Sequence, residues 1–184
     1  SLITKRTRAI VVINPNNPTG AVYPREVLEA IARIAEKHHL VVFADEIYDQ
    51  MTYDGAEFVP MATLAHHTLC CTMSGLSKVY RACGYRVGWA VFSGDIENAR
   101  DYLSALELLS SLRLCSNVAG QWAVQTALGG YQSVKELIRP GGRLYESRKA
   151  IVDAVARSKY LTLTVPRGAL YAFVGVDTQR LPGF

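Results

Sequence analysis

The first half of the chain combines continuous apolar runs with one stretch of helical spacing. The runs cover residues 9–13, 40–44, 68–73 and 88–93. Such runs are typical of strands buried on both faces, as in parallel sheets. Apolar side chains from Val27 to Ala35 recur every three to four residues after Pro24, which suits the start of a helix. The pattern predicts an α/β fold with a mostly parallel sheet flanked by helices.

The second half of the chain is mainly helical in pattern. Helices are expected at residues 95–112, at 119–128 and from the residue after Gly142 to about Ser158. The buried face of the first of these helices is expected to include Leu103, Leu106, Leu109 and Ser110. A strand pair is expected at 161–165 and 169–174, joined through residues 166–168. This change of pattern suggests that a smaller α+β domain begins near residue 131.

Composition and charge exclude several classes of protein. The 184 residues are 49% hydrophobic and 20% charged, which is typical of a globular chain with one domain or slightly more. The sequence has no apolar run long enough for a membrane span, and it does not start with a signal peptide pattern. Its 20 basic and 16 acidic residues give a net charge of +4, and the basic residues are scattered along the chain. We therefore expect no membrane partner and no nucleic-acid partner.

Cysteine and histidine spacing predicts neither a metal site nor a disulfide framework. Cys70, Cys71, Cys83 and Cys115 contain no C-x-x-C pair, so reduced thiols in a cytoplasmic protein are expected. The two His-His pairs, at 38–39 and 66–67, have no Cys or carboxylate at ligand spacing.

Polar residues of types that can bind ligands or catalyse reactions follow three predicted strands. Asn17 follows the first strand, Asp45 ends the second and Lys78 follows the third. In open α/β sheets, ligands bind beyond the carboxyl ends of the strands, so these side chains are candidates for one crevice. Singly, such residues are usually solvated lysines or turn aspartates. Together they are compatible with an ion pair, an acid–base pair or carbonyl chemistry at a Schiff-base lysine.

Three motifs stand in order along the chain. They are Asn-Pro-Asn-Asn-Pro-Thr-Gly at 14–20, Ala-Asp-Glu-Ile-Tyr at 44–48 and Ser-Gly-Leu-Ser-Lys-Val-Tyr-Arg-Ala-Cys-Gly-Tyr-Arg-Val-Gly-Trp at 74–89. In sequence and spacing they resemble the class I/II pyridoxal-phosphate aminotransferases of fold type I. Further runs, at 111–117, 125–132, 140–146 and 166–173, most resemble bacterial glutamate–pyruvate (alanine) transaminases.

The resemblance implies a role for each of the central motif residues. Lys78 would bind the aldehyde of pyridoxal 5'-phosphate covalently and then act as general base and acid. Asp45 would pair with the protonated pyridine nitrogen, which keeps the ring an electron sink. Tyr48 and Asn17 would hydrogen-bond the 3-oxygen of the ring. Lys78, Asp45 and Tyr48 are thus the expected catalytic residues, and no metal is expected.

The resemblance also implies how the cofactor phosphate is bound. Arg86 would bind the phosphate, bidentately if the geometry allows. Many relatives have a phosphate-binding serine three residues before the lysine, where this chain has Gly75. We assign that role to Ser77, and we assign Ser74 only to the turn.

Residues 1–130 are expected to be the second half of the cofactor-binding large domain. Residues 131–184 are expected to form a connecting helix and the beginning of the small domain. Members of the family are longer, and four of their parts cannot be placed here: a phosphate loop, a ring-stacking aromatic, a tyrosine that reaches the neighbouring subunit and the arginine that binds the substrate carboxylate. We therefore expect an internal fragment of a homodimeric enzyme that is inactive alone.

The expected reaction of the full-length parent is transamination between alanine or glutamate and pyruvate or 2-oxoglutarate. An aspartate or other amino-acid aminotransferase is the first alternative. Other fold-type-I enzymes, such as a β-lyase or a cyclopropane-forming synthase, are a second. An aminotransferase-like sensor domain of a transcription regulator and an inactive folded fragment remain open as well.

Overall fold

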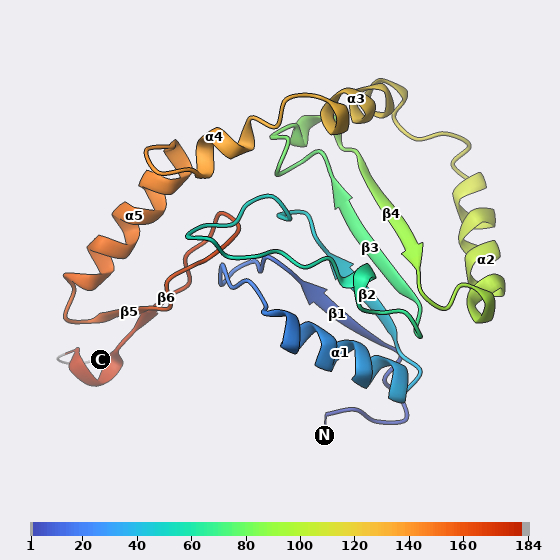
Figure 1. The fold of residues 1–184 in the computed structure, drawn as a ribbon, viewed down its shortest axis with the longest axis horizontal. Helices are drawn as coiled ribbons and strands as arrows, with labels where there is room; N and C mark the ends of the chain where they lie inside the picture. Colours follow the sequence, from blue (N-terminus) through green and yellow to red (C-terminus); the bar gives the residue numbers. More distant parts are fainter. Residues whose placement is uncertain (1, 182–184) are drawn as a thin grey trace. The chain divides into compact units, whose positions relative to one another are not determined.

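The structure, a computed structural model, describes residues 2–181 and divides them into two compact units (Figure 1). Within the described part, the first unit contains residues 2–13, 24–47 and 59–132. The second contains residues 14–23, 48–58 and 133–181. The second unit is therefore built from three separate stretches of chain.

A four-stranded sheet forms the centre of the first unit, in the order β1 (Ala9–Ile13), β2 (Val41–Asp45), β3 (Cys70–Gly75) and β4 (Gly88–Ser93). The first three strands are parallel, and β4 is antiparallel to β3. The predicted, mostly parallel sheet is confirmed. The bounds of β1 and β4 are as predicted, whereas β2 and β3 begin one and two residues later than expected.

The core of the first unit lies between this sheet and α1 (Arg25–Lys37). The helix buries Leu28, Ala32 and Ala35, which share one face at helical spacing. The strand residues Val42 and Cys70 are fully buried beneath such apolar neighbours. Continuous apolar runs therefore became central strands, as their composition requires.

The first unit also contains further helical segments, of which α2 and α3 expose most of their residues. They are η1 (Met61–Thr63), η2 (Cys83–Tyr85), η3 (Glu97–Ala99), α2 (Arg100–Ser111) and α3 (Val118–Gly129). The helices predicted at 95–112 and 119–128 are confirmed, but the predicted burial of Leu109 and Ser110 is wrong. Leu109 is 62% exposed, and α2 has no buried residue. An apolar helix face is buried only where another element covers it, and the described residues place none over this one.

The second unit combines helices with a small sheet. Its elements are α4 (Val134–Ile138), α5 (Arg143–Ala156), β5 (Leu161–Leu163), β6 (Val174–Val176) and η4 (Thr178–Arg180). The strands β5 and β6 are antiparallel. The helix predicted after Gly142 is confirmed as α5. The short α4 was not predicted, because five residues are too few to show a helical period.

The strand predicted at 169–174 is wrong for most of its length, since β6 begins only at Val174. The backbone of residues 167–169 pairs instead with residues 51–53. Tyr53 N–H donates to the Arg167 carbonyl, and Ala169 N–H donates to the Met51 carbonyl. Ala169 has a φ of +59°, which interrupts an extended run. Periodicity within 169–174 carries no information about this long-range partner.

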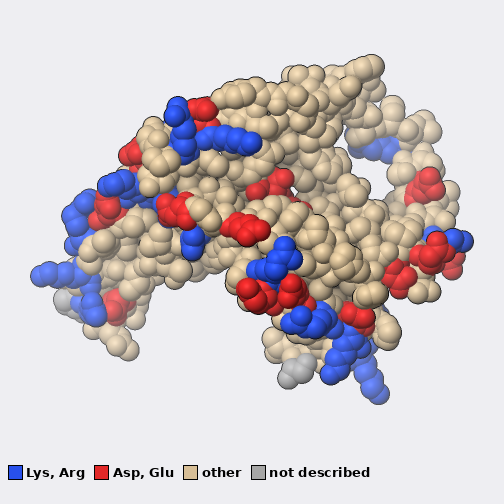
Figure 2. All heavy atoms as spheres, in the orientation of Figure 1, with Lys and Arg blue, Asp and Glu red and all other residues tan. Residues whose placement is uncertain are grey.

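The charge distribution shows no single basic block. In Figure 2 the Lys and Arg side chains lie among Asp and Glu side chains, whereas the surface over α3 carries no visible charge. Within residues 2–181, every helix is too short or too polar to cross a bilayer.

Candidate active site

The carboxyl end of β2 presents Asp45 and Glu46 to opposite faces of the sheet, because side chains alternate along a strand. Asp45 is half-buried, and its carboxylate accepts a hydrogen bond of 3.2 Å from Ile47 N–H. Glu46 is buried, and its carboxylate accepts a 2.7 Å hydrogen bond from Met61 N–H. The Glu46 N–H also donates to the Met73 carbonyl of β3. These bonds hold the strand end that carries Asp45.

Ser77 and Lys78 lie in a loop that folds back beyond the carboxyl end of β3. Leu76 N–H donates to the Val87 carbonyl and Ala82 N–H donates to the Leu76 carbonyl, which closes the loop at its base. Ser77 and Lys78 are both half-buried. The loop therefore places the lysine at the same end of the sheet as the end of β2.

Arg86 stands immediately before β4 and is exposed. Its backbone has a φ of +53°, an uncommon value for a residue with a side chain. One of its guanidinium N–H groups donates to the Cys83 carbonyl at 2.7 Å. Because Gly75 pairs with Gly88 in the β3–β4 register, Arg86 lies across the hairpin from the Ser77 and Lys78 loop.

Gly75 explains the departure from the family pattern. A Cβ at this position would lie 2.7 Å from the Val87 carbonyl oxygen and 3.0 Å from the Gly88 Cα. Both are backbone atoms of the neighbouring strand, so a serine does not fit without moving β4 away from β3. Ser77, the serine predicted to bind the phosphate, lies in the loop beyond the strand.

The amino end of α3 supports the backbone around Arg86. Asn117 caps this helix by accepting from Gly120 N–H at 3.1 Å, and its amide nitrogen donates to the Tyr85 carbonyl at 2.9 Å. Gly120 packs closely on Val87 and on the Tyr85 carbonyl. This role of Asn117 is not predicted by the sequence pattern. An asparagine before a helix is a recognisable cap signal, but the signal does not show what else the side chain binds.

Asn17 and Tyr48 belong to the second unit. Asn17 is exposed in a turn shaped by Asn16, whose side chain accepts from Thr19 N–H. Tyr48 is only 2% exposed, and its hydroxyl oxygen lies 2.6 Å from the hydroxyl oxygen of Tyr171. The two rings meet edge to face, with centroids 5.7 Å apart. Tyr171 was not among the predicted site residues.

The structure thus gathers four of the six predicted site residues at one end of the first unit's sheet. These four are Asp45, Ser77, Lys78 and Arg86. Asn17 and Tyr48 are positioned within the second unit, and Tyr48 follows Asp45 by three residues in the chain.

Two titratable groups close to Tyr48 in sequence have pKa values raised by burial. Burial raises the pKa of the Asp49 carboxyl, and the hydrogen bond from Gln50 N–H opposes this effect. Burial likewise raises the pKa of the Tyr53 phenol, against the opposing positive charge of Arg148. Tyr53 therefore stays protonated at neutral pH and donates to the Ala169 carbonyl at 3.0 Å.

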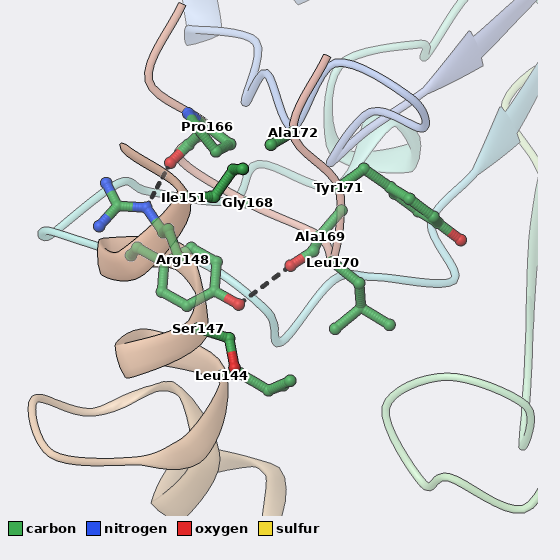
Figure 3. Close-up of a pocket in the computed structure, with 11 residues that line it drawn as sticks. Leu144, Ser147, Arg148, Ile151, Pro166, Gly168, Ala169, Leu170, Tyr171 and Ala172 are labelled. Atoms are coloured by element: carbon green, nitrogen blue, oxygen red, sulfur yellow. Dashed lines mark hydrogen bonds between the residues drawn. The ribbon is translucent and has the colours of Figure 1, made fainter. Parts of the chain in front are cut away.

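A cavity of about 110 Å³ lies between α5 and residues 166–172 of the second unit (Figure 3). Arg148 is its charged lining residue, but the guanidinium is already engaged. It donates to the Pro166 carbonyl at 2.6 Å, pairs with Asp54 and lies over the Tyr53 ring. The contacts of the Arg148 guanidinium described here are therefore with other groups of the second unit.

A larger hollow, of about 480 Å³, lies in the first unit at the amino ends of β2 and β3. His39, His67 and Asp95 are among its lining residues. It is at the opposite end of the strands from Asp45. Across residues 2–181 no group of three or more His, Cys, Asp or Glu side chains is placed to hold a metal ion.

Asp45 and Lys78 lie at the carboxyl ends of two parallel strands, and Arg86 precedes the antiparallel β4 at the same end of the sheet. Residues 1–181 match the family model described as aminotransferase class I and II, and the chain belongs to this family. The predicted membership is confirmed.

Named relatives extend this result. The chain is 53% identical over 178 residues to glutamate-pyruvate aminotransferase AlaA of Escherichia coli K12, a match that covers 97% of this chain and 44% of the relative. It is 48% identical over 179 residues to alanine aminotransferase of Mycobacterium tuberculosis H37Rv, covering 97% of this chain and 42% of that relative. The chain therefore spans less than half the length of these curated relatives.

Solved structures agree with the fold. An aminotransferase from Escherichia coli superposes with a TM-score of 0.94 at 52% identity, covering 97% of this chain and 44% of that one. Alanine aminotransferase from Pyrococcus furiosus superposes with a TM-score of 0.91 at 37% identity, covering 98% of this chain and 45% of that one.

Proposed function

We propose that a protein of the relatives' full length containing this chain is a pyridoxal-phosphate-dependent aminotransferase. Its substrates are alanine and glutamate as amino donors, with pyruvate and 2-oxoglutarate as the matching oxo acids. The observation that carries the proposal is the grouping of Asp45, Lys78 and Arg86 at one end of the sheet. The names of the relatives, glutamate-pyruvate and alanine aminotransferase, support the substrate class.

The donor set fits the proposed cofactor. Pyridoxal 5'-phosphate carries an aldehyde, a basic ring nitrogen and a phosphate, and the sheet end offers an amine, a carboxylate and a guanidinium. Bound to its lysine, the cofactor supplies an electron sink for the electrons of a broken Cα–H bond. Arg86 and Ser77 bind the phosphate in this proposal, with charge-assisted hydrogen bonds from the arginine.

The remaining residues prepare the site for proton transfer. Lys78 holds the cofactor and then carries the proton away from the substrate Cα and back to it. Asp45 supplies the negative charge that favours a protonated ring nitrogen. Tyr48 and Asn17 donate hydrogen bonds to the 3-oxygen of the ring.

We also propose that the whole protein is a cytoplasmic homodimer, with residues 1–130 in its large domain and 131–184 leading into its small domain. The support is the family resemblance, together with four cysteines that are free thiols. An aspartate aminotransferase is the second candidate, because the chain is 35% identical to the aspartate/prephenate aminotransferase of Thermus thermophilus.

Lysine labelling tests the central assignment. In the complete protein, borohydride reduction in the presence of pyridoxal phosphate is expected to attach the pyridoxyl group to Lys78. Lys78→Ala is expected to abolish the label and to lower the rate by several orders of magnitude. Lys159→Ala, at an exposed position of the second unit, is the control, and it is expected to keep both the pyridoxyl label and the reaction rate. A peptide map with the label on another lysine would refute the assignment.

Steady-state assays test the substrate class. Alanine and glutamate are expected to be the better amino donors in the complete protein. A preference for aspartate over alanine above about tenfold, which is about 1.4 kcal/mol of transition-state binding, would favour the second candidate instead.

A further inference from the structure

The backbone of Arg86 has a conformation that residues with a side chain rarely adopt. Its φ is +53° and its ψ is +45°, which places it in the left-handed region. This region is unfavourable for any residue other than glycine, so it is kept only where the surrounding structure holds it. The hydrogen bonds of the backbone around Arg86 therefore decide whether this conformation persists.

The peptide group between Tyr85 and Arg86 is held at both of its polar atoms. The Arg86 N–H donates to the Cys83 carbonyl, with 3.3 Å between nitrogen and oxygen. The Tyr85 carbonyl accepts a 2.9 Å hydrogen bond from the side-chain amide of Asn117. Rotation of this peptide group changes the φ of Arg86, so it is the motion by which Arg86 would leave the left-handed region. Both hydrogen bonds oppose that rotation, and Asn117 supplies its bond from outside the turn.

Asn117 uses both ends of its side-chain amide. The amide oxygen accepts from Gly120 N–H at 3.1 Å, and the amide nitrogen donates to the Tyr85 carbonyl. Since a backbone N–H needs an acceptor and a carbonyl needs a donor, one orientation of the amide serves both. Figure 1 shows α3, which begins after Asn117, beside the connection between β3 and β4. A side chain with an acceptor alone would cap the helix without holding the Tyr85 carbonyl.

The Arg86 side chain extends from this fixed backbone. The direction of its Cα–Cβ bond is set by the backbone dihedral angles, so a flip of the preceding peptide group would redirect the guanidinium. One guanidinium N–H donates to the Cys83 carbonyl at 2.7 Å. A guanidinium has five N–H groups, so this bond leaves others that can bind an anion. The conformation of the turn therefore governs where these donors are presented.

We propose that Asn117 is a positioning residue, which keeps Arg86 in the left-handed conformation and thereby directs its guanidinium toward the cofactor phosphate. This inference rests on the proposed function, because that function assigns the phosphate to Arg86. Asn117 acts through the peptide group between Tyr85 and Arg86 and does not itself bind the phosphate. All three residues belong to the first unit, so the argument stays within one compact body.

The substitution Asn117→Ser tests the proposal because it separates the two hydrogen bonds of this side chain. Serine caps a helix about as well as asparagine, but its side chain is too short to reach the Tyr85 carbonyl as well. Asn117 is exposed, so the shorter side chain opens no cavity. In the complete protein, hydrogen exchange of the amides in residues 83–87, followed by mass spectrometry, is expected to become several-fold faster.

The affinity of Asn117→Ser for pyridoxal phosphate is expected to fall about tenfold, which is about 1.4 kcal/mol. The physical reason is that Arg86 then spends most of its time outside the conformation that binds the phosphate. An absorbance titration of the complete protein with pyridoxal phosphate measures this change.

A second ligand and a matched variant separate the proposed role from a general loss of structure. Pyridoxal has the same ring and aldehyde but no phosphate, so its affinity is expected to be the same in Asn117→Ser and in the unaltered protein. Asn98→Ser is the matched control. Asn98 is also exposed, and its amide donates to the Asp95 carboxylate at the other end of the sheet. This control is expected to leave the exchange of residues 83–87 and both affinities unchanged.

The outcomes distinguish this inference from the function on which it rests. If exchange of residues 83–87 is as slow in Asn117→Ser as in the unaltered protein, Asn117 does not hold the turn, and the proposed function stands. Faster exchange with unchanged affinity for pyridoxal phosphate, or an equal loss of affinity for pyridoxal, would also overturn the role of Asn117. If the unaltered protein forms no borohydride-reducible bond with pyridoxal phosphate, the proposed function fails and the inference fails with it.

Discussion

At the scale of single residues, the four cysteines occupy two opposite environments. Cys70 and Cys71 are buried in β3, whereas Cys83 and Cys115 are exposed. Burial raises the pKa of the Cys70 thiol from 9.0 to about 11, and the charge of Glu46 adds to this effect. Burial also raises the pKa of Cys71. Since the thiolate is the reactive form, the cysteines of β3 are protected in two ways: burial limits the access of reagents, and the raised pKa values keep the thiols protonated.

Alkylation is therefore expected to discriminate between the two pairs. Iodoacetamide at neutral pH is expected to modify Cys83 and Cys115 in the folded chain and to leave Cys70 and Cys71 unmodified. In denaturant all four are expected to react. Mass spectrometry of the peptides reads the result, and rapid labelling of Cys70 in the native chain would contradict the burial of β3.

The raised pKa of Cys70 also predicts how stability depends on pH. The folded pKa lies above the unfolded one, so the folded state retains a proton that the unfolded state loses. This contribution to the free energy of unfolding is complete below pH 9 and is lost as the pH rises through about 11. The urea midpoint is expected to fall over this range. The urea midpoint of Cys70→Ala is expected to fall less steeply with pH. Cys83→Ser, at an exposed position, is the control, and its midpoint is expected to follow that of the unaltered chain.

At the scale of elements, α3 acts on the candidate phosphate site without contributing a ligand. Its cap residue Asn117 binds the Tyr85 carbonyl, and Gly120 lets the helix approach Val87. Tyr85 and Val87 flank Arg86, whose backbone is in the left-handed region. The helix thereby holds a local conformation that an isolated hairpin connection rarely adopts.

Two glycine substitutions in this one helix test that coupling. A Cβ at Gly120 would overlap Val87, whereas a Cβ at Gly129 meets nothing within 4 Å. In the complete protein, Gly120→Ala is expected to weaken binding of pyridoxal phosphate about tenfold, since overpacking costs roughly 1–3 kcal/mol. Gly129→Ala is expected to bind as the unaltered protein does. Cofactor titration followed by fluorescence measures both; unchanged affinity in Gly120→Ala would separate α3 from the phosphate site.

At the scale of the whole molecule, a large part of the apolar surface is uncovered in the described chain. On α2, α3 and their connection, Leu112 is 77% exposed, Leu114 90% and Trp122 75%. The sheet edge β1 exposes Val11 as well. Contiguous apolar surface and open strand edges favour association with other chains.

The 184-residue chain alone is therefore expected to self-associate and to lack transaminase turnover. Size-exclusion chromatography is expected to show oligomers, and Leu114→Glu with Trp122→Glu is expected to shift them toward the monomer. Alanine–2-oxoglutarate turnover is expected to equal that of free cofactor, because the chain alone has no residue assigned to orient the substrate carboxylate. Robust turnover by this chain, free of host enzyme, would contradict the expectation.

The features that the sequence alone determined are those that depend on residues close together in the chain. Runs such as Ala9–Ile13 carry enough β-branched and apolar side chains to predict a buried strand, whatever lies around them. The same holds for the helical face of Leu28, Ala32 and Ala35. The motifs around Asp45 and Lys78 predicted the family, and the strand ends predicted where these residues lie.

Only the tertiary structure decided what depends on contacts between distant parts of the chain. The strand expected at 169–174 was lost because residues 51–53 pair with 167–169, more than a hundred positions away. Leu109 was expected to be buried, but burial depends on a covering element and not on the helix itself. The hydrogen bonds of Tyr171 with Tyr48 and of Asn117 with the Tyr85 carbonyl join distant parts of the chain, and such pairings leave no period or motif in the sequence.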